Sequence, residues 1–328
     1  MFSKSRIAVF ALAALLILAI SRSNFIVQAA ALVSPGTNYE AIALLKWYPA
    51  NKTANFSVGP GPSGVAFDGS NMWVVNVTDY TVTKMRVSDG AVLGNFPVAS
   101  TPANNAVQLA FDGASMWVAN ESNNTVTKLR ASDGAALGSF PVGKNPRGVA
   151  FDGAGIWVVN YEGTVTKLRA TDGAVLGTFA VGTDATAAAF DGAHIWVTNA
   201  GSNSVTKLRA GDGANLGTFP VGNSPIGIAF DGANIWTANY LSNTVTKLRV
   251  SDGATLGTFT AGTGPEDVAF DGANMWVTNW FSGTVTKLRA NDGSLLGTFS
   301  VGTNPYGIAF DGANMWVANA ASNTVSKL

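Results

Sequence analysis

The sequence contains a small set of side chains that could bind a ligand, and they stand out from an otherwise repetitive chain. Glu266 and Asp267 are adjacent carboxylates and Gln108 is an amide, so they supply oxygen atoms of the kind that hold cations. Flat aromatic rings provide contact area at little entropic cost. The candidate ligand-binding residues are Gln108, Arg147, Tyr161, Glu162, Tyr240, Glu266, Asp267, Trp280, Phe281 and Tyr306.

Residue types on which most enzyme mechanisms depend are scarce. The chain has no cysteine and one histidine, His194, which replaces an asparagine in a repeated turn. The glycine-rich strings at 59–64 and 138–145 do not open helices, so neither predicts a nucleotide site. We therefore predict no catalytic residue and no cofactor, with a divalent metal entering only if the protein is an enzyme after all.

A repeat of about 40 residues decides the fold class. The string Phe-Asp-Gly occurs seven times, with its phenylalanine at 67, 111, 151, 190, 230, 270 and 310. The copy at 268–303 contains four short apolar or β-branched runs, at 268–270, 275–279, 284–289 and 295–301, separated by turn residues. Four strands per copy in seven copies predict an all-β, seven-bladed β-propeller of four-stranded antiparallel blades.

Each copy carries one tryptophan in its second run. A buried tryptophan removes about 150–250 Å² from water, so seven equivalent residues suit packing between blades better than seven identical ligand sites. The tryptophans are Trp73, Trp117, Trp157, Trp196, Trp236, Trp276 and Trp316.

The two ends of the chain predict how the ring closes and where the protein resides. The last copy stops in its third run, and 55–59 match the missing fourth, so an N-terminal strand should close the ring. Lys4 and Arg6 precede an apolar run at 7–20, followed by small residues at 29–31. We predict a helical signal peptide at 1–31, an N-terminal extension at 32–54 and the propeller at 55–328. The chain would be secreted or periplasmic after cleavage near Ala31, the alternative being an uncleaved anchor helix; no other segment is apolar enough to span a membrane.

A propeller sorts its turns onto two faces. The turns between the first and second strands and between the third and fourth strands share one face, and here both are nearly uniform Asp-Gly turns. We name this the invariant face. The other connections differ from copy to copy and form the variable face. Thirteen aspartates and thirteen Lys or Arg residues belong to the repeat, so their charges cancel. Among the remaining charged residues, six acids and two bases fall on the variable face: Asp79, Glu121, Glu162, Asp184, Glu266 and Asp267, and Lys144 and Arg147.

The channel mouth should be lined by residues four positions before each Phe-Asp-Gly phenylalanine. These are Ser63, Val107, Arg147, Thr186, Ile226, Glu266 and Tyr306, and at the next position Gln108, Ala187 and Asp267 replace the usual glycine. Glu266, Asp267, Trp280, Phe281 and Tyr306 make the densest cluster, on the last two blades. Ordinary drift of loop sequences is the alternative explanation for this variation.

The strings Trp276–Asn279, Trp196–Asn199 and Trp316–Asn319, followed by S-N-T-V-T-K-L, resemble the YVTN-type repeats of YncE-like β-propeller proteins. The chain is also distantly similar to streptogramin lyases and to SMP-30/gluconolactonases. The lyase resemblance implies a histidine with a divalent metal over the variable face, where this sequence has no histidine. The lactonase resemblance implies a metal held by acidic and amide side chains; Glu266, Asp267 and Gln108 supply part of such a shell, but Gln108 belongs to a distant blade.

These observations favour an exported, non-catalytic propeller that binds through its variable face. A soluble protein partner, a glycan or a cationic ligand would suit aromatic and acidic side chains. Nucleic acid is not expected, because the net charge is zero and no basic cluster is present. Two alternatives remain: a metal-assisted lactonase or lyase at the channel mouth, and a structural protein of the cell envelope.

Overall fold

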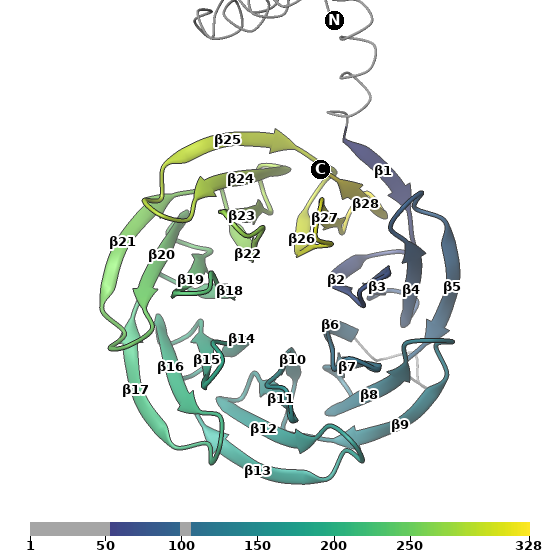
Figure 1. Ribbon diagram of the computed structural model, residues 1–328, viewed down its shortest axis with the longest axis horizontal. Coiled ribbons are helices and arrows are strands. Elements are labelled where there is room, and N and C mark those ends of the chain that lie inside the picture. Colours follow the sequence, from purple (N-terminus) through teal and green to yellow (C-terminus); the bar gives the residue numbers. More distant parts are fainter. Residues whose placement is uncertain (1–52, 99–105) are drawn as a thin grey trace, which may run out of the picture. The chain divides into compact units, whose positions relative to one another are not determined.

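Seven four-stranded antiparallel sheets are arranged in a ring around a central axis (Figure 1). The computed structural model describes residues 53–98 and 106–328, and every regular element within them is a β-strand. The predicted seven-bladed propeller is therefore confirmed. The predicted signal helix at 1–31 lies outside the described residues. No helix in the described part of the chain is long and apolar enough to cross a bilayer.

Each blade runs from the channel outwards in chain order. The first strands line the channel: β2 (Pro62–Phe67), β6 (Ala106–Phe111), β10 (Pro146–Phe151), β14 (Ala185–Phe190), β18 (Pro225–Phe230), β22 (Pro265–Phe270) and β26 (Pro305–Phe310). The second strands are β3 (Asn71–Asn76), β7 (Ser115–Asn120), β11 (Gly155–Asn160), β15 (His194–Asn199), β19 (Asn234–Asn239), β23 (Asn274–Asn279) and β27 (Met315–Asn319).

The outer strands complete the blades and close the ring. The third strands are β4 (Thr81–Arg86), β8 (Thr125–Arg130), β12 (Thr164–Arg169), β16 (Ser204–Arg209), β20 (Thr244–Arg249), β24 (Thr284–Arg289) and β28 (Thr324–Lys327). The fourth strands are β5 (Val92–Pro97), β9 (Ala136–Pro141), β13 (Val175–Ala180), β17 (Asn215–Pro220), β21 (Thr255–Thr260), β25 (Leu295–Ser300) and, for blade seven, β1 (Ala54–Ser57). Because β1 pairs with β28, the predicted closure by an N-terminal strand is confirmed.

The first strands are longer than the sequence predicts. In blade six, β22 begins at Pro265 rather than at Val268, because Pro265 pairs with Asn279 before the register shifts. Residues 266 and 267 form a bulge without ladder partners opposite them. The hydroxyl of Thr278 accepts a hydrogen bond from the Asp267 backbone N–H and donates one to the carbonyl of Tyr306 in the next blade. The Thr278 side chain thus provides hydrogen bonds where the bulge interrupts those of the backbone ladder.

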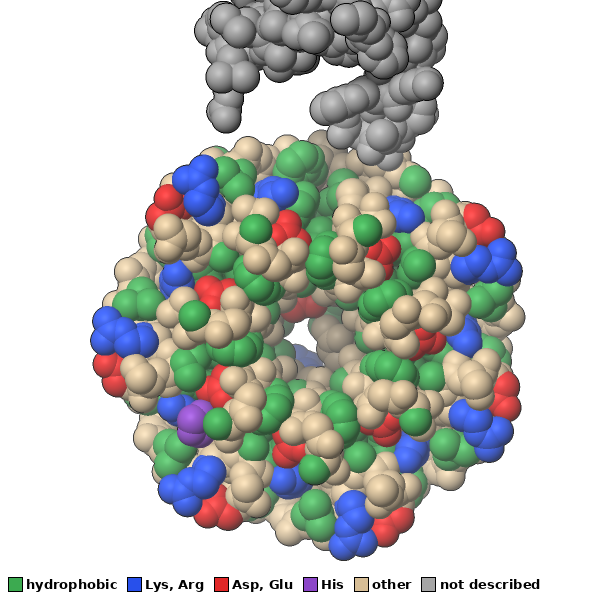
Figure 2. All heavy atoms as spheres, viewed as in Figure 1, with side chains coloured by type: hydrophobic (Ala, Val, Ile, Leu, Met, Phe, Trp, Pro, Cys, Tyr) green, Lys and Arg blue, Asp and Glu red, His purple; other side chains and the backbone are tan. Residues whose placement is uncertain are grey.

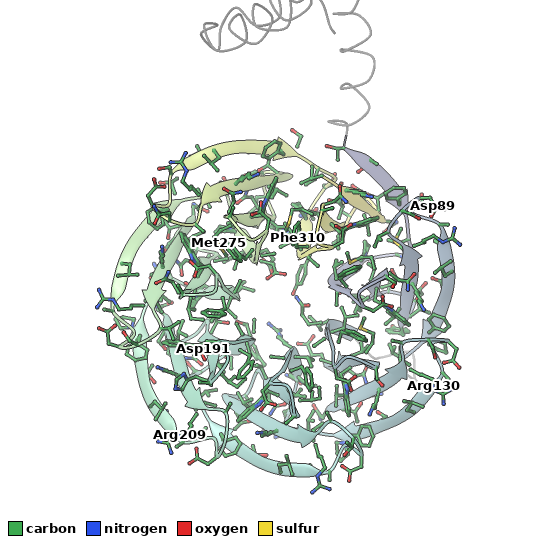
Figure 3. All side chains as sticks on the ribbon, in the orientation of Figure 1. Asp89, Arg130, Asp191, Arg209, Met275 and Phe310 are labelled. Atoms are coloured by element: carbon green, nitrogen blue, oxygen red, sulfur yellow. The ribbon has the colours of Figure 1, made fainter. Side chains whose placement is uncertain are left out.

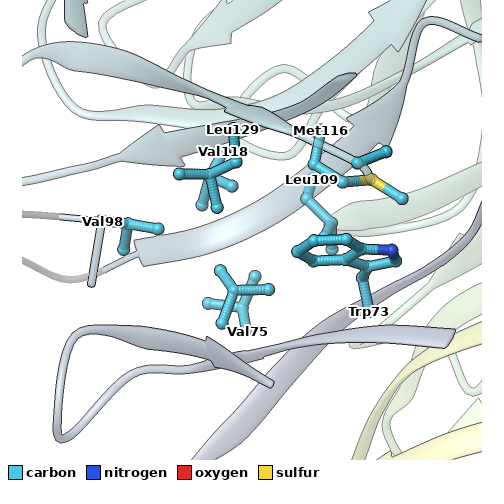
Figure 4. Packing of buried hydrophobic residues seen from close by; sticks show 9 residues of the cluster. Trp73, Val75, Val98, Leu109, Met116, Val118 and Leu129 are labelled. Carbon is cyan, nitrogen blue, oxygen red and sulfur yellow. The ribbon is translucent and has the colours of Figure 1, made fainter. Parts of the chain in front are cut away.

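The repeated tryptophans form the core between blades, as predicted. Trp73 of blade one is fully buried and packs against Met116, Val118 and Leu129 of blade two (Figure 4). Its indole Nε1 donates a hydrogen bond of 2.7 Å to Asp68 in the adjacent turn. The same indole–aspartate bond occurs in all seven blades. The repeated aspartate therefore fixes both the turn and the core residue.

The repeated lysine of the third strand adds a link that the sequence reasoning did not anticipate. In blade one, Lys84 lies 5.1 Å from the centre of the Trp73 ring. Its Nζ donates a hydrogen bond of 2.6 Å to the carbonyl of Ala131 in blade two. Equivalent lysines lie over the tryptophans of the other six blades. Six of the seven lysines donate a hydrogen bond to a carbonyl of the next blade, whereas Lys287 pairs with Asp271 of its own blade.

The invariant face is a regular pattern of satisfied turns. Figure 2 shows this face, with acidic and basic side chains repeating around an axial opening. In six turns an aspartate pairs with the arginine three residues before it, as in Arg86–Asp89 and Arg209–Asp212. Asp89, Arg130 and Arg209 lie at the outer rim (Figure 3). The chemistry on this face is turn chemistry, as the sequence predicts.

Candidate functional site

The channel mouth is lined by the residues predicted from the repeat. A narrow pocket of about 60 Å³ is bordered by Val107, Gln108, Arg147, Thr186, Ala187, Ile226, Gly227, Glu266, Asp267 and Tyr306. Of the seven positions that precede Phe-Asp-Gly by four residues, only Ser63 is absent from this lining. Ser63 is buried, and its hydroxyl donates a hydrogen bond of 2.9 Å to the carbonyl of Val107.

Glycines allow the seven first strands to approach one another around the channel. A Cβ atom at Gly227 would lie 2.6 Å from the Cα atom of Asp267, and one at Gly307 would lie 2.5 Å from the carbonyl oxygen of Ser63. At the position three residues before each Phe-Asp-Gly phenylalanine, glycine alternates with a larger residue from blade to blade. Because the number of blades is odd, two of these glycines, Gly307 and Gly64, lie on neighbouring blades. This pair leaves space that side chains from blades two and six can enter.

Gln108 and Asp267 meet in that space. The Asp267 carboxylate accepts hydrogen bonds from the backbone N–H groups of Val268 at 2.9 Å and Ile308 at 3.2 Å, and the Gln108 side chain also hydrogen-bonds to it. A Cβ atom at Gly64 would lie 2.7 Å from Gln108 Oε1, which places that amide beside blade one. The expectation that Gln108 is too distant to share a site with Asp267 is therefore wrong, because the two glycines let both side chains lean towards each other.

Glu266 is the most unusual group at the mouth. Its side chain borders the pocket and the residue is only 6% exposed, yet no described residue forms a hydrogen bond or ion pair with its carboxyl group. Burial and the neighbouring charge of Asp267 raise the pKa of Glu266 to about 8, against a smaller opposing effect of Arg147. Burial also raises the pKa of Asp267, to about 6, although its three hydrogen-bond donors oppose the change.

Arg147 is engaged by residues other than Glu266. Its guanidinium group pairs with Glu121 at 2.8 Å and lies 4.0 Å from the centre of the Tyr161 ring. Glu162 accepts a hydrogen bond of 3.1 Å from the backbone N–H of Lys144. Tyr161 and Glu162 thus take part in contacts around blade three, and the cation that could have neutralised Glu266 is held by Glu121.

Aromatic side chains border the mouth on blades five to seven. The rings of Trp280 and Tyr306 meet edge to face at 5.9 Å, and those of Tyr240 and Phe281 lie 5.7 Å apart. Phe281 is 64% exposed and Leu241 is 68% exposed. We call Tyr240, Leu241, Trp280, Phe281 and Tyr306 the aromatic rim.

The rim and the channel pocket form one continuous site. Tyr306 belongs to both, since it borders the pocket and contacts Trp280. The charge of Glu266 adds to the effect of burial in raising the pKa of both Tyr240 and Tyr306, so both phenols lie near this carboxyl group. The structure therefore brings together eight of the ten predicted residues, which are Gln108, Arg147, Tyr240, Glu266, Asp267, Trp280, Tyr306 and, through its contact with Tyr240, Phe281.

Leu241 was missed by sequence reasoning, although a signal was present. Tyr240–Leu241 occupies the same turn position in blade five as Trp280–Phe281 in blade six, whereas blade seven has Ala320 and Ala321 there. Two adjacent blades thus share a large apolar pair at one turn. An alignment of the seven copies, turn by turn, would have found it.

The described residues do not fit the divalent metal that either enzyme resemblance implies. They contain no group of three or more His, Cys, Asp or Glu side chains that could hold a metal ion. His194 lies at the turn between β14 and β15, on the invariant face, where its Nδ1 is 3.0 Å from Asp191. The two carboxylates and one amide at the mouth remain an incomplete ligand set.

Comparison with known proteins supports the fold and does not identify a family. No family model and no curated protein sequence matches the chain. Among solved structures, a streptogramin B lyase matches with 19% identity and a TM-score of 0.72 over 84% of this chain and 96% of its own. The virginiamycin B lyase of Staphylococcus aureus matches with 17% identity and a TM-score of 0.73 over 84% and 98%. The protein U3-55K reaches a TM-score of 0.76 at 14% identity over 85% and 98%. Similar structures thus include enzymes and a protein not named as one.

Proposed function

We propose that this chain is an exported, non-catalytic binding propeller of the YVTN-repeat type, whose ligand docks on the aromatic rim at the channel mouth. The observation that carries the proposal is the exposed ring of Phe281, which contacts Tyr240 near the buried Glu266. Large apolar side chains in water are unfavourable, and a cluster of them around a concave mouth is typical of binding surfaces.

The charge of the site favours a cationic ligand. Six acidic and two basic side chains occupy the variable face, and Arg147 is already paired with Glu121. Aromatic faces also attract cations, by about 0.5–2 kcal/mol each. A soluble protein partner or a glycan would use the same rim only if it presented positive charge to Glu266.

A metal-assisted lyase or lactonase is the second candidate, and the fold shared with the two streptogramin-type lyases favours it. The described residues lack a metal-ligand set, so we derive no reaction step through a metal. Calorimetric titration with calcium, magnesium and manganese separates the candidates: saturable binding at millimolar metal would support the enzyme. A purely structural envelope role predicts that neither metals nor ligands bind at the mouth.

Export is part of the proposal and has its own test. The charged, apolar and small-residue segments of 1–31 favour cleavage near Ala31, giving a secreted or periplasmic protein. N-terminal sequencing of the protein recovered outside the cytoplasm should begin close to residue 32. An intact N-terminus in the membrane fraction would indicate an anchor helix instead.

The rim is tested by removing its apolar side chains. We expect the double variant Trp280→Ala/Phe281→Ala to lose at least tenfold in affinity for 2-phenylethylammonium, measured by calorimetry, because the ring of this probe would pack on these two aromatic side chains. The turn should still fold, since blade seven carries Ala320 and Ala321 at the same positions. Leu176→Ala is the matched control, as it removes an exposed side chain from an outer strand. Equal affinity in wild type and double variant would overturn the proposal.

A further inference from the structure

We infer that the channel beneath the aromatic rim binds the primary ammonium group of an amine, and that Glu266 releases a proton as this group enters. The inference rests on the proposed function for the position of the rest of the ligand, which would lie on the rim. It specifies the chemical class of ligand and couples its binding to pH.

The carboxyl group of Glu266 has no structural role that explains its presence. At the same position other blades carry Ser63, Val107, Thr186 and Ile226, so the fold does not require an acid there. Burying an ionisable group without a partner costs several kcal/mol unless the group stays neutral. A residue that is 6% exposed and borders a pocket without a partner among the described residues is therefore poised for a group that comes from outside.

The surroundings select a cation with hydrogen atoms to donate. Asp267 is held in place by Gln108 and by two backbone N–H groups, so its carboxylate can attract a cation without changing position. The tyrosines Tyr240 and Tyr306 lie near Glu266 and offer hydroxyl oxygens as acceptors. A primary ammonium group has three N–H donors for such acceptors.

The pocket is narrow. Its volume is about 60 Å³, where about 10–15 Å³ of such space is enough for one water molecule. An ammonium group at the end of a methylene chain fits that space, whereas a quaternary ammonium group is bulkier and has no donor. A divalent metal lacks a sufficient set of carboxylates among the described residues.

Binding of the ammonium ion is accompanied by the release of one proton. With a pKa of about 8, Glu266 is mostly protonated at neutral pH, and an ammonium ion binds its carboxylate form. Entry of the ammonium ion therefore breaks the O–H bond of Glu266 and releases H⁺ to solvent, while the amine keeps all its protons. The charged or titratable groups that face Glu266 are Asp267 on β22, Arg147 on β10, Tyr306 on β26 and Tyr240 after β19, with Glu121 neutralising Arg147.

The test is calorimetry of the full chain with 2-phenylethylammonium between pH 6 and 9. Phosphate and imidazole buffers, which have different heats of ionisation, report the protons exchanged; Tris is avoided because it is itself a primary amine. We expect release of close to one proton at pH 6.5 and an affinity that rises about tenfold per pH unit up to pH 8. Above that value the affinity should level off.

One variant and three further probes test the role of Glu266. Glu266→Gln keeps the shape of the side chain and should abolish both proton release and the pH dependence, with a loss of affinity of at least tenfold at pH 8. The N,N,N-trimethyl derivative of the probe, and neutral 2-phenylethanol, should bind at least tenfold more weakly than the primary amine. Methylammonium, which has no ring, should compete with the probe.

The outcomes separate this inference from the proposed function. If binding depends on Trp280 and Phe281 but is independent of pH and unchanged in Glu266→Gln, the rim is confirmed and the ammonium site is wrong. If Trp280→Ala/Phe281→Ala binds 2-phenylethylammonium as tightly as wild type and still releases a proton, the channel site is confirmed and the proposed role of the rim is wrong. Wild-type binding without proton exchange would overturn the inference by itself.

Discussion

Strand β22 has carboxylates at both ends, and their surroundings are opposite. At the invariant face, Asp271 accepts hydrogen bonds from the backbone N–H groups of Ala273 and Asn274 and from the indole of Trp276. Burial raises its pKa, but these bonds lower it more, so its net pKa lies below the ordinary value. At the variable face, burial prevails and raises the pKa of Glu266 and Asp267.

This difference shows how the chain separates stability from function. Where the sequence repeats, most polar groups have a partner within the blade or in the next one, so these residues stabilise the ring; among the described residues the buried Oδ1 atoms of Asn76, Asn120 and Asn160 are exceptions. Where the sequence departs from the repeat, Glu266 is buried without a partner and Phe281 is exposed, so these residues destabilise it. Residues that work against stability and lie together around a pocket are the ones we assign to binding.

The largest expected effect contrasts two tryptophans on neighbouring blades. Trp236 is fully buried between blades five and six, whereas Trp280 is half-buried at the mouth. Trp236→Ala should lower the free energy of unfolding by about 3–5 kcal/mol, since it leaves a cavity and removes the hydrogen bond from the indole to Asp231. Trp280→Ala should lower it by less than about 1 kcal/mol. Urea denaturation followed by circular dichroism measures both; similar losses would erase the distinction between the faces.

The second effect is a dependence of stability on pH that the two ends of β22 should show with opposite sign. The lowered pKa of Asp271 contributes stability that is present above pH 3.8 and is lost as the pH falls below it. The raised pKa of Glu266 contributes stability that is present below pH 4.5 and is lost as the pH rises towards about 8. We expect Glu266→Gln to unfold at higher temperature than wild type at pH 8 and to match it at pH 4.5.

The magnitude follows from the displacement of the pKa. Each pKa unit corresponds to about 1.4 kcal/mol, so the gain of Glu266→Gln at pH 8 should exceed 1 kcal/mol. Differential scanning calorimetry from pH 4.5 to 8.5 provides the comparison. Asp271→Asn should instead be less stable than wild type at pH 8. A Glu266→Gln variant that is no more stable than wild type at pH 8 would mean that this carboxyl group has a partner in solution.

Most of the fold could be predicted from the sequence because it depends on repetition. Seven Phe-Asp-Gly strings and seven tryptophans predict the blades and their packing, and the match of residues 55–59 to a fourth strand predicts the closure. The mouth positions also follow from their fixed spacing to Phe-Asp-Gly. The start of the first strand in blade six was predicted three residues too late, at Val268 instead of Pro265, since a bulge at 266–267 does not show in the pattern of apolar residues.

The chemistry of the site could be predicted only in part. Composition identified Glu266, Asp267 and the aromatic residues, but the contact between Gln108 and Asp267 depends on which blades place glycine side by side. Pairing of Arg147 with Glu121, rather than with Glu266, depends on how the turn after β7 approaches β10. These are geometric outcomes of ring closure, which no single copy of the repeat contains.

The third effect contrasts two lysines. Lys207 is buried, lies over the Trp196 ring and donates a hydrogen bond of 2.7 Å to the carbonyl of Val250 in the next blade. Lys207→Met should lower the free energy of unfolding by about 1–3 kcal/mol, because that carbonyl loses its donor. The side chain of Lys144 is exposed on the variable face, so Lys144→Met should have almost no effect. Equal urea midpoints for the two variants would show that the repeated lysines do not join the blades.

The smallest effect tests whether repetition by itself signals stability. Arg249 and Asp252 pair at 2.9 Å, and equivalent pairs recur in five other blades, but both side chains are half-exposed to water. Ion pairs in water contribute little, because solvent screens them and their long side chains lose freedom. Arg249→Ala should leave the urea midpoint unchanged at both low and high salt. A clear loss at low salt that disappears in 1 M sodium chloride would mean that even the exposed part of the repeat stabilises the ring, and the invariant face would then be structural throughout.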